Sequence, residues 1–151
     1  MHYKVSVIVP IYNVRDYLAR CVENLMNQTL REVEYIFVED CATDDSYQIL
    51  MDTLARFPHR RGDVRVIRHE VNKGLTMSRA DGLDVAAGDF IIHSDSDDWT
   101  DVTMFEKMYD KAVSDGAEIC ICDFFHVRKD GLKRENVTLD CRKPHKEFMR
   151  D

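Results

Sequence analysis

The sequence contains little glycine or proline, and it lacks the glycine-rich phosphate-binding motifs of several large enzyme classes. Its 151 residues include six glycines and three prolines, and the glycines do not cluster. It has neither a G-x-G-x-x-G nor a G-x-x-x-x-G-K-[ST] motif, which argues against a dinucleotide oxidoreductase and a P-loop NTPase. It also has no G-x-S-x-G motif, which argues against an α/β-hydrolase.

Long apolar runs and an excess of basic charge are missing too. No run approaches the roughly 20 apolar residues of a membrane-spanning helix, and the N-terminus does not resemble a signal peptide. The net charge of −7 disfavours general attraction to nucleic acid or anionic lipid. We therefore expect a cytoplasmic chain with no transmembrane segment and no nucleic-acid partner, with peripheral membrane attachment as an alternative. The five scattered cysteines are expected to be reduced and mostly buried.

What the sequence does contain is a regular alternation of short apolar runs and longer runs with helical spacing. Strands are predicted at residues 4–10, 34–39, 64–68, 90–93 and 118–127. Helices are predicted at residues 16–27, 45–56, 75–87 and 102–115, with Asp44 as an N-cap and Gly88 and Gly116 as terminators. This order predicts an α/β fold, a mostly parallel sheet flanked by helices on both faces.

Polar residues follow four of the predicted strands, at the sheet edge where such folds bind ligands. The densest group is Asp95, Asp97 and Asp98. Three carboxylates this close repel one another unless solvent or a cation neutralises them, and their oxygens suit Mg²⁺ or Mn²⁺. The alternative is a solvated acidic loop in which Asp98 or Asp101 stabilises the N-terminus of the next helix.

Two other classes use similar acidic motifs. An EF-hand loop beginning at Asp95 would place Thr100 where the sharp turn needs glycine, and a strand precedes it, so this class is excluded. A phosphatase of the haloacid-dehalogenase type also carries Asp-x-Asp after a strand. It usually does so after the first strand, whereas this motif lies late in the chain, so the phosphatase is a minor alternative.

Five segments in this order carry a resemblance to a known family. VSVIVPIYN, a helix ending in NQT, VEDCATDDS, NKGLTMSRADGL and AAGDFIIHSDSDDW resemble the family 2 glycosyltransferases of the GT-A fold, over roughly residues 4–125. The resemblance implies an incomplete nucleotide-sugar-binding domain at residues 1–128. Residues 129–151 would be a charged tail that begins the acceptor-binding half.

The resemblance also implies roles for particular residues. Asp40 would hold the base, usually uracil, and Asp97 together with Asp95 would bind Mn²⁺ or Mg²⁺, with Asp97 as the first choice. Glu39 and Ala42 depart from the Asp and Ser that are commoner in this family. The residues expected to bind the nucleotide-sugar are Pro10, Tyr12, Asn13, Asp40, Lys73, Asp95 and Ser96.

The activity implied is transfer of a sugar, with inversion, from a nucleoside-diphosphate donor, expected to be a UDP-sugar, in polysaccharide biosynthesis. The acceptor hydroxyl would belong to a glycan, a lipid-linked acceptor or a protein. Because the general base of this family lies beyond the acidic motif, we expect it beyond Asp151. The chain is then a donor-binding fragment, with self-association through the incomplete fold. The alternative is a non-catalytic nucleotide-binding or interaction module of the same fold.

Overall fold

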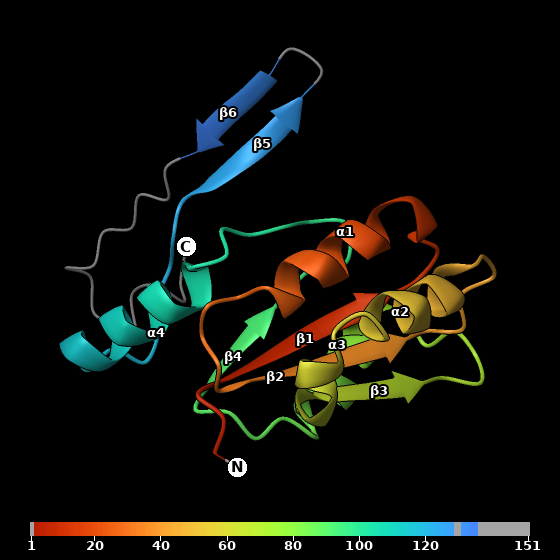
Figure 1. The fold of residues 1–151 in the computed structure, drawn as a ribbon, viewed down its shortest axis with the longest axis horizontal. Helices are drawn as coiled ribbons and strands as arrows, with labels where there is room; N and C mark the ends of the chain where they lie inside the picture. The colour runs from red at the N-terminus through yellow and green to blue at the C-terminus, as the bar shows by residue number, and fades with distance from the viewer. Residues whose placement is uncertain (1, 129–130, 136–151) are drawn as a thin grey trace, which may run out of the picture. The chain divides into compact units, whose positions relative to one another are not determined.

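The computed structural model describes residues 2–128 and 131–135, and the chain divides into two compact units, residues 1–111 and 112–151. The first unit contains a four-stranded parallel sheet (Figure 1). Its strands, in the spatial order β3-β2-β1-β4, are β1 (Val5–Ile11), β2 (Val33–Glu39), β3 (Val64–Arg68) and β4 (Phe90–His93). The predicted parallel α/β sheet is therefore confirmed.

Register brings the carboxyl ends of these strands to one edge. Ile11 lies opposite Glu39, Glu39 lies opposite Arg68, and Ile8 lies opposite His93. Because the strands are parallel, the residues that follow each of them gather at the same edge of the sheet.

Alternating side chains of the central strands form an apolar layer on each face of the sheet. Val7 and Val9 belong to the larger layer, which also contains residues of the helices α1 (Arg15–Met26) and α2 (Ser46–Leu54). Ile8 belongs to the smaller layer, on the face that α3 (Leu75–Leu83) covers. Both central strands are buried along their whole length, which explains why apolar residues occupy both of their faces.

The remaining helical segments are α4 (Met104–Asp115) and a 3₁₀ helix, η1 (Pro58–Asp63), which the sequence analysis did not predict. Gly116 has a φ of +62° directly after α4, as expected for a residue that ends a helix. Asp45, rather than Asp44, occupies the N-cap position of α2. Asp44 still accepts hydrogen bonds from the backbone N–H groups of Ser46 and Arg15, and so it holds the starts of both α2 and α1.

The prediction that the third helix continues through residue 87 to Gly88 is wrong, because α3 ends at Leu83. The chain after it turns back toward the sheet, where Val85 packs against the smaller apolar layer. Gly88 serves close packing and not helix termination: a Cβ atom there would lie 2.6 Å from the backbone nitrogen of Ser6.

The predicted fifth strand at residues 118–127 is also corrected. The second unit contains a separate two-stranded antiparallel sheet, β5 (Phe124–Arg128) and β6 (Gly131–Glu135). An apolar run indicates an extended segment but does not identify its partner, and here the partner is the next segment of the chain. β6 lies inside the expected charged tail, and the rest of that tail, residues 136–151, lies outside the described residues. The domain division at residue 128 stays a prediction.

Two expectations drawn from composition can be compared with the described residues. The four cysteines among them are reduced, as expected. Most are not buried, however: Cys21 is buried, Cys41 and Cys120 are half-buried, and Cys122 is exposed. No helix in the described part of the chain is both long enough and apolar enough to cross a membrane.

The close approach at Gly88 predicts a steric penalty for a larger residue. Gly88→Ala should lower the free energy of unfolding by about 1–3 kcal/mol, because the new methyl group overlaps backbone that cannot move aside cheaply. Gly62→Ala is the matched control, since nothing lies within 4 Å of its added methyl group. Urea denaturation measures both variants, and equal unfolding midpoints would contradict the packing role of Gly88.

Candidate functional site

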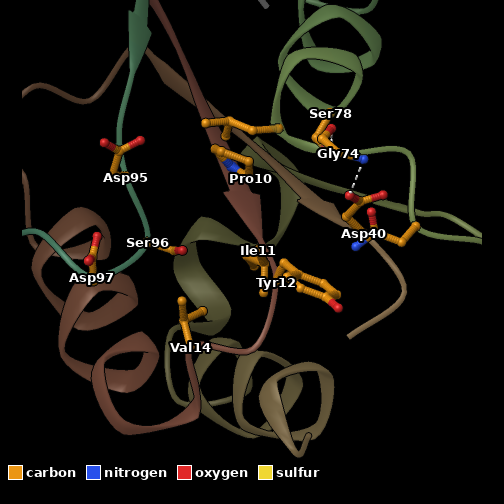
Figure 2. A pocket seen from close by; sticks show the side chains of 12 residues that line it. Pro10, Ile11, Tyr12, Val14, Asp40, Gly74, Ser78, Asp95, Ser96 and Asp97 are labelled. Carbon is orange, nitrogen blue, oxygen red and sulfur yellow. Dashed lines mark hydrogen bonds between the residues drawn. The ribbon is translucent and has the colours of Figure 1, made fainter. Parts of the chain in front are cut away.

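An open pocket of about 410 Å³ lies at the carboxyl edge of the parallel sheet (Figure 2). The end of β1, the segments that follow β1, β2 and β4, and the start of α3 with the segment before it line the pocket. The lining residues are Pro10, Ile11, Tyr12, Val14, Asp40, Asn72, Gly74, Leu75, Ser78, Asp95, Ser96 and Asp97.

Asp40 joins the end of β2 to the segment between β3 and α3. Its side chain is 3% exposed and accepts three hydrogen bonds. Oδ1 lies 2.7 Å from Nδ1 of His69 and 2.7 Å from the backbone nitrogen of Lys73. Oδ2 accepts the backbone N–H of Gly74 at 2.8 Å, the contact drawn in Figure 2. The carboxylate therefore holds the loop before α3 at the pocket wall.

These hydrogen bonds also determine the ionisation of Asp40. Burial acts to raise its pKa, but donation from Lys73, His69 and Gly74 outweighs burial and leaves the pKa below the ordinary value. A carboxyl with a lowered pKa stabilises the fold above its unfolded pKa, and this stabilisation is lost as the pH falls through the folded pKa. At neutral pH Asp40 is a buried, ionised acceptor.

The acidic loop after β4 supplies the opposite side of the pocket. Figure 2 shows Asp95 and Asp97 on one side, Asp40 on the other and Tyr12 between them. Asp95 Oδ1 accepts a hydrogen bond from an Nη atom of Arg79 at 2.7 Å. The acidic side chains predicted to bind a cation and the carboxylate predicted to bind a base thus line the same pocket.

Negative charge accumulates in this loop. The pKa of Asp98 is raised, first by partial burial and then by the charges of Asp97 and Asp95. Arg79 offsets part of the charge on Asp95, whereas Asp97 and Asp98 form no ion pair with any of the described residues. The loop is a place where a positive ion would relieve repulsion.

The donor atoms fit a divalent cation that is shared with a ligand. Among residues 2–128, no group of three or more His, Cys, Asp or Glu side chains is arranged to enclose a metal ion. Asp95 and Asp97 line the pocket, and their side chains carry hard carboxylate oxygens. Mg²⁺ is commonly held by one or two carboxylates, with waters and substrate phosphates completing its shell. The residues present match that pattern.

Two of the residues predicted to bind the ligand do not line the pocket. Asn13, which has a φ of +50°, accepts the backbone N–H of Thr43 at 2.8 Å through Oδ1 and so joins the loops after β1 and β2. Lys73 directs Nζ to Asp81, 2.8 Å from Oδ2, while its backbone nitrogen binds Asp40. The others, Pro10, Tyr12, Asp40, Asp95, Ser96 and Asp97, come together at the pocket.

The sequence analysis missed some residues that line the pocket or hold Asp40 in place. Ser78 and Gly74 line the pocket, and Ser78 Oγ donates to the Gly74 carbonyl oxygen at 3.1 Å. His69 contacts Asp40 from the end of β3, where the rule that ligands bind at strand ends could have identified it. Glu39, which departs from the commoner family residue, is buried and accepts the backbone N–H of Ala42. The longer side chain thus stabilises the loop that carries Asp40.

Comparison with known proteins identifies the class. A parallel α/β sheet with its pocket at the strand ends is the fold of the GT-A glycosyltransferases. The chain matches the model of the family "Glycosyl transferase family 2" over residues 6–151, and it belongs to that family. The phosphatase alternative is therefore wrong.

Particular relatives show how much of a longer protein is matched. The uncharacterized glycosyltransferase EpsJ of Bacillus subtilis is 35% identical over 126 residues, which are 83% of this chain and 35% of EpsJ. The crystal structure of S. aureus TarS residues 1–349 in complex with UDP has a TM-score of 0.66 and 29% identity, and covers 74% of this chain and 32% of that one. The structure of the same TarS fragment in complex with UDP-GlcNAc has the same TM-score and identity, and the match covers 74% of this chain and 31% of the TarS chain. The chain thus spans about a third of the length of these relatives.

The electrostatics of the acidic loop predict a coupled titration. In Asp97→Asn, the pKa of Asp98 should fall toward its ordinary value, because one of the charges that raise it is removed. Carboxyl carbon NMR shifts followed over pH measure this change. Asp52→Asn, on the exposed face of α2, is the control and should leave Asp98 unaffected. An Asp98 pKa that is the same in Asp97→Asn and the parent would contradict the charge coupling.

Proposed function

We propose that the pocket binds a nucleoside-diphosphate sugar together with Mn²⁺ or Mg²⁺, as the donor site of an inverting glycosyltransferase. The observation that carries the proposal is the placement of Asp40 and Asp97 on opposite sides of one pocket. One end thus offers a hydrogen-bond acceptor for a base, and the other offers carboxylates for a cation.

At the base end, Asp40 retains acceptor capacity. A carboxylate has about four lone-pair sites, and three N–H groups already use Asp40. One site is left for an N–H group of a base, and uracil carries such a group at its ring edge. Tyr12, which is 47% exposed in the pocket wall, offers a ring surface beside it. The TarS structures with UDP and UDP-GlcNAc support a uridine donor.

At the phosphate end, charge requires a cation. Asp95 and Asp97 would repel a diphosphate, and the chain as a whole carries −7. When bound, the cation would supply Lewis-acid neutralisation of the diphosphate oxygens. The chain's own contribution is to position the carboxylates: Arg79 holds Asp95, and Ser96, between Asp95 and Asp97, is buried at 6% exposure.

The remaining parts of the reaction stay predictions. These are inversion, the general base, the acceptor hydroxyl of a glycan, lipid-linked or protein acceptor, a role in polysaccharide biosynthesis and a cytoplasmic location. The alternative, a non-catalytic nucleotide-binding or interaction module of the same fold, lacks the transfer reaction.

The proposal predicts metal-dependent nucleotide binding. In calorimetry, the chain should bind UDP in the presence of Mn²⁺ and bind it at least about tenfold more weakly without the ion, since the diphosphate then faces uncompensated carboxylates. Asp97→Ala should remove the gain that Mn²⁺ gives. Asp52→Ala, on the exposed surface of α2, is the control and should bind like the parent.

Two results would count against the proposal. One is UDP binding of equal strength with and without Mn²⁺. The other is no UDP binding by a sample whose circular dichroism shows that it is folded.

A further inference from the structure

Two side-chain amides hold the far end of the acidic loop. Asn24 lies on α1, and Gln28 follows the end of that helix in the NQT segment, which the proposed donor site does not include. Asn24 binds Thr100, and Gln28 binds both Thr100 and Asp101. We call Asn24 and Gln28 the amide clamp. Neither of them lines the pocket, so any influence on a ligand passes through the loop.

Asn24 satisfies both backbone groups of a single residue. Its Nδ2 donates to the Thr100 carbonyl oxygen at 2.7 Å, and its Oδ1 accepts the backbone N–H of Thr100 at 2.9 Å. The Thr100 hydroxyl donates to the same Oδ1 at 3.1 Å. The N–H and the C=O of a residue belong to the peptide planes on either side of it, so this one amide orients both planes. The chain shortly after Asp97 is fixed in this way.

Gln28 connects the end of the loop to the apolar core. It is 2% exposed, and its Nε2 donates to the Thr100 hydroxyl oxygen at 3.0 Å and to the Asp101 carbonyl oxygen at 3.1 Å. Its Oε1 accepts the backbone N–H of Phe105, in the first turn of α4, at 3.5 Å. Phe105 is itself buried in the larger apolar layer. Gln28 therefore joins the loop to a part of the chain that cannot shift easily.

The near end of the loop is held as well. The backbone N–H of Ser94 donates to the carbonyl oxygen of Ile8 on β1 at 3.0 Å. The thiol of Cys21, on the same helix as Asn24, donates to the Asp95 carbonyl oxygen at 3.7 Å. The acidic turn is thus anchored before its first carboxylate and after its last one, with α1 contributing to both anchors.

Anchoring at both ends matters because the turn carries like charges. Asp95, Asp97 and Asp98 lie within four residues, and Asp97 and Asp98 form no ion pair with any of the described residues. A free loop would relax by moving these carboxylates apart, whereas a turn held at both ends keeps them together until a positive ion offsets the repulsion. Ligands held in place before the ion arrives lower the reorganisation that binding must overcome.

We propose that the amide clamp positions the acidic loop for cation binding. Asn24 and Gln28 are positioning residues that act through the backbone of Thr100 and Asp101. This inference rests on the proposed donor site. It adds that the share of UDP affinity that Mn²⁺ contributes depends on two uncharged amides outside the pocket, while binding of the base at Asp40 does not.

Calorimetric titration of UDP at a series of Mn²⁺ concentrations tests the clamp in Asn24→Ala. This variant loses all three contacts to Thr100 without changing any charge. The Mn²⁺ concentration that gives half of the gain in UDP affinity should rise about tenfold or more, as is typical when groups that orient metal ligands are lost. The EPR signal of free Mn²⁺ gives a second, spectroscopic measure of ion binding in the UDP complex.

Two controls separate this effect from general damage. Uridine has no phosphates, so its affinity should be the same in Asn24→Ala and in the parent. Asn27→Ala removes the same amide group at the end of the same helix, but the exposed Asn27 side chain donates to the Glu23 carbonyl oxygen within that helix, at 2.8 Å. Asn27→Ala should keep the parental Mn²⁺ requirement.

Hydrogen exchange of the parent gives a reading that does not depend on any variant folding. Before Mn²⁺ or UDP is added, the Thr100 amide should exchange at least about tenfold more slowly than in an unstructured chain, because Asn24 holds it. Rapid exchange there would overturn the preformed loop. A parental Mn²⁺ requirement in folded Asn24→Ala, or an equal loss of uridine affinity, would overturn the clamp alone. No UDP binding by the folded parent would overturn the proposed function as well.

Discussion

The hydrogen bonding of one buried carboxylate organises the site. Asp40 accepts N–H groups from His69, Lys73 and Gly74, and so it joins the end of β2 to the end of β3 and to the start of α3. Burial would oppose its ionisation, but three donors more than compensate. The wall of the pocket on this side is therefore tied by hydrogen bonds to the sheet edge that carries it.

The other side of the pocket carries carboxylates with few hydrogen-bond donors. Asp95, Asp97 and Asp98 lie close together with few donors, and the pKa of Asp98 is raised, first by its partial burial and then by the charges of Asp97 and Asp95. A site with a satisfied carboxylate at one end and unsatisfied carboxylates at the other suits a ligand whose two ends differ in charge. A nucleoside diphosphate with a cation has that asymmetry: a neutral base that donates hydrogen bonds, and phosphates that need a positive ion.

Much of this arrangement could be predicted from the sequence, because local patterns specify it. Short runs rich in apolar and β-branched residues predicted the four parallel strands, and residues in the loops after those strands, such as Tyr12, Asp40 and Asp97, lie at the pocket. Features that depend on distant contacts could not be predicted. Gly88 resembles a helix terminator but packs on Ser6, 82 positions away. The role of His69 likewise depends on its contacts with Asp40 and Asp81, which are distant in the sequence. The strand expected at residues 118–127 forms only at Phe124–Arg128, and it pairs with β6, because an apolar run does not indicate which strand will be its partner.

The most direct test of the account maps the ligand onto the backbone. Amide NMR shifts of the labelled chain, recorded as UDP is added with Mg²⁺, should change most at Tyr12, Gly74 and Ser96, the residues that surround the space between Asp40 and Asp97. Amides on the outer surface of α2, such as Gln48, should stay unchanged. Shifts concentrated away from the carboxyl edge of the sheet would contradict the central claim that this pocket holds the nucleotide.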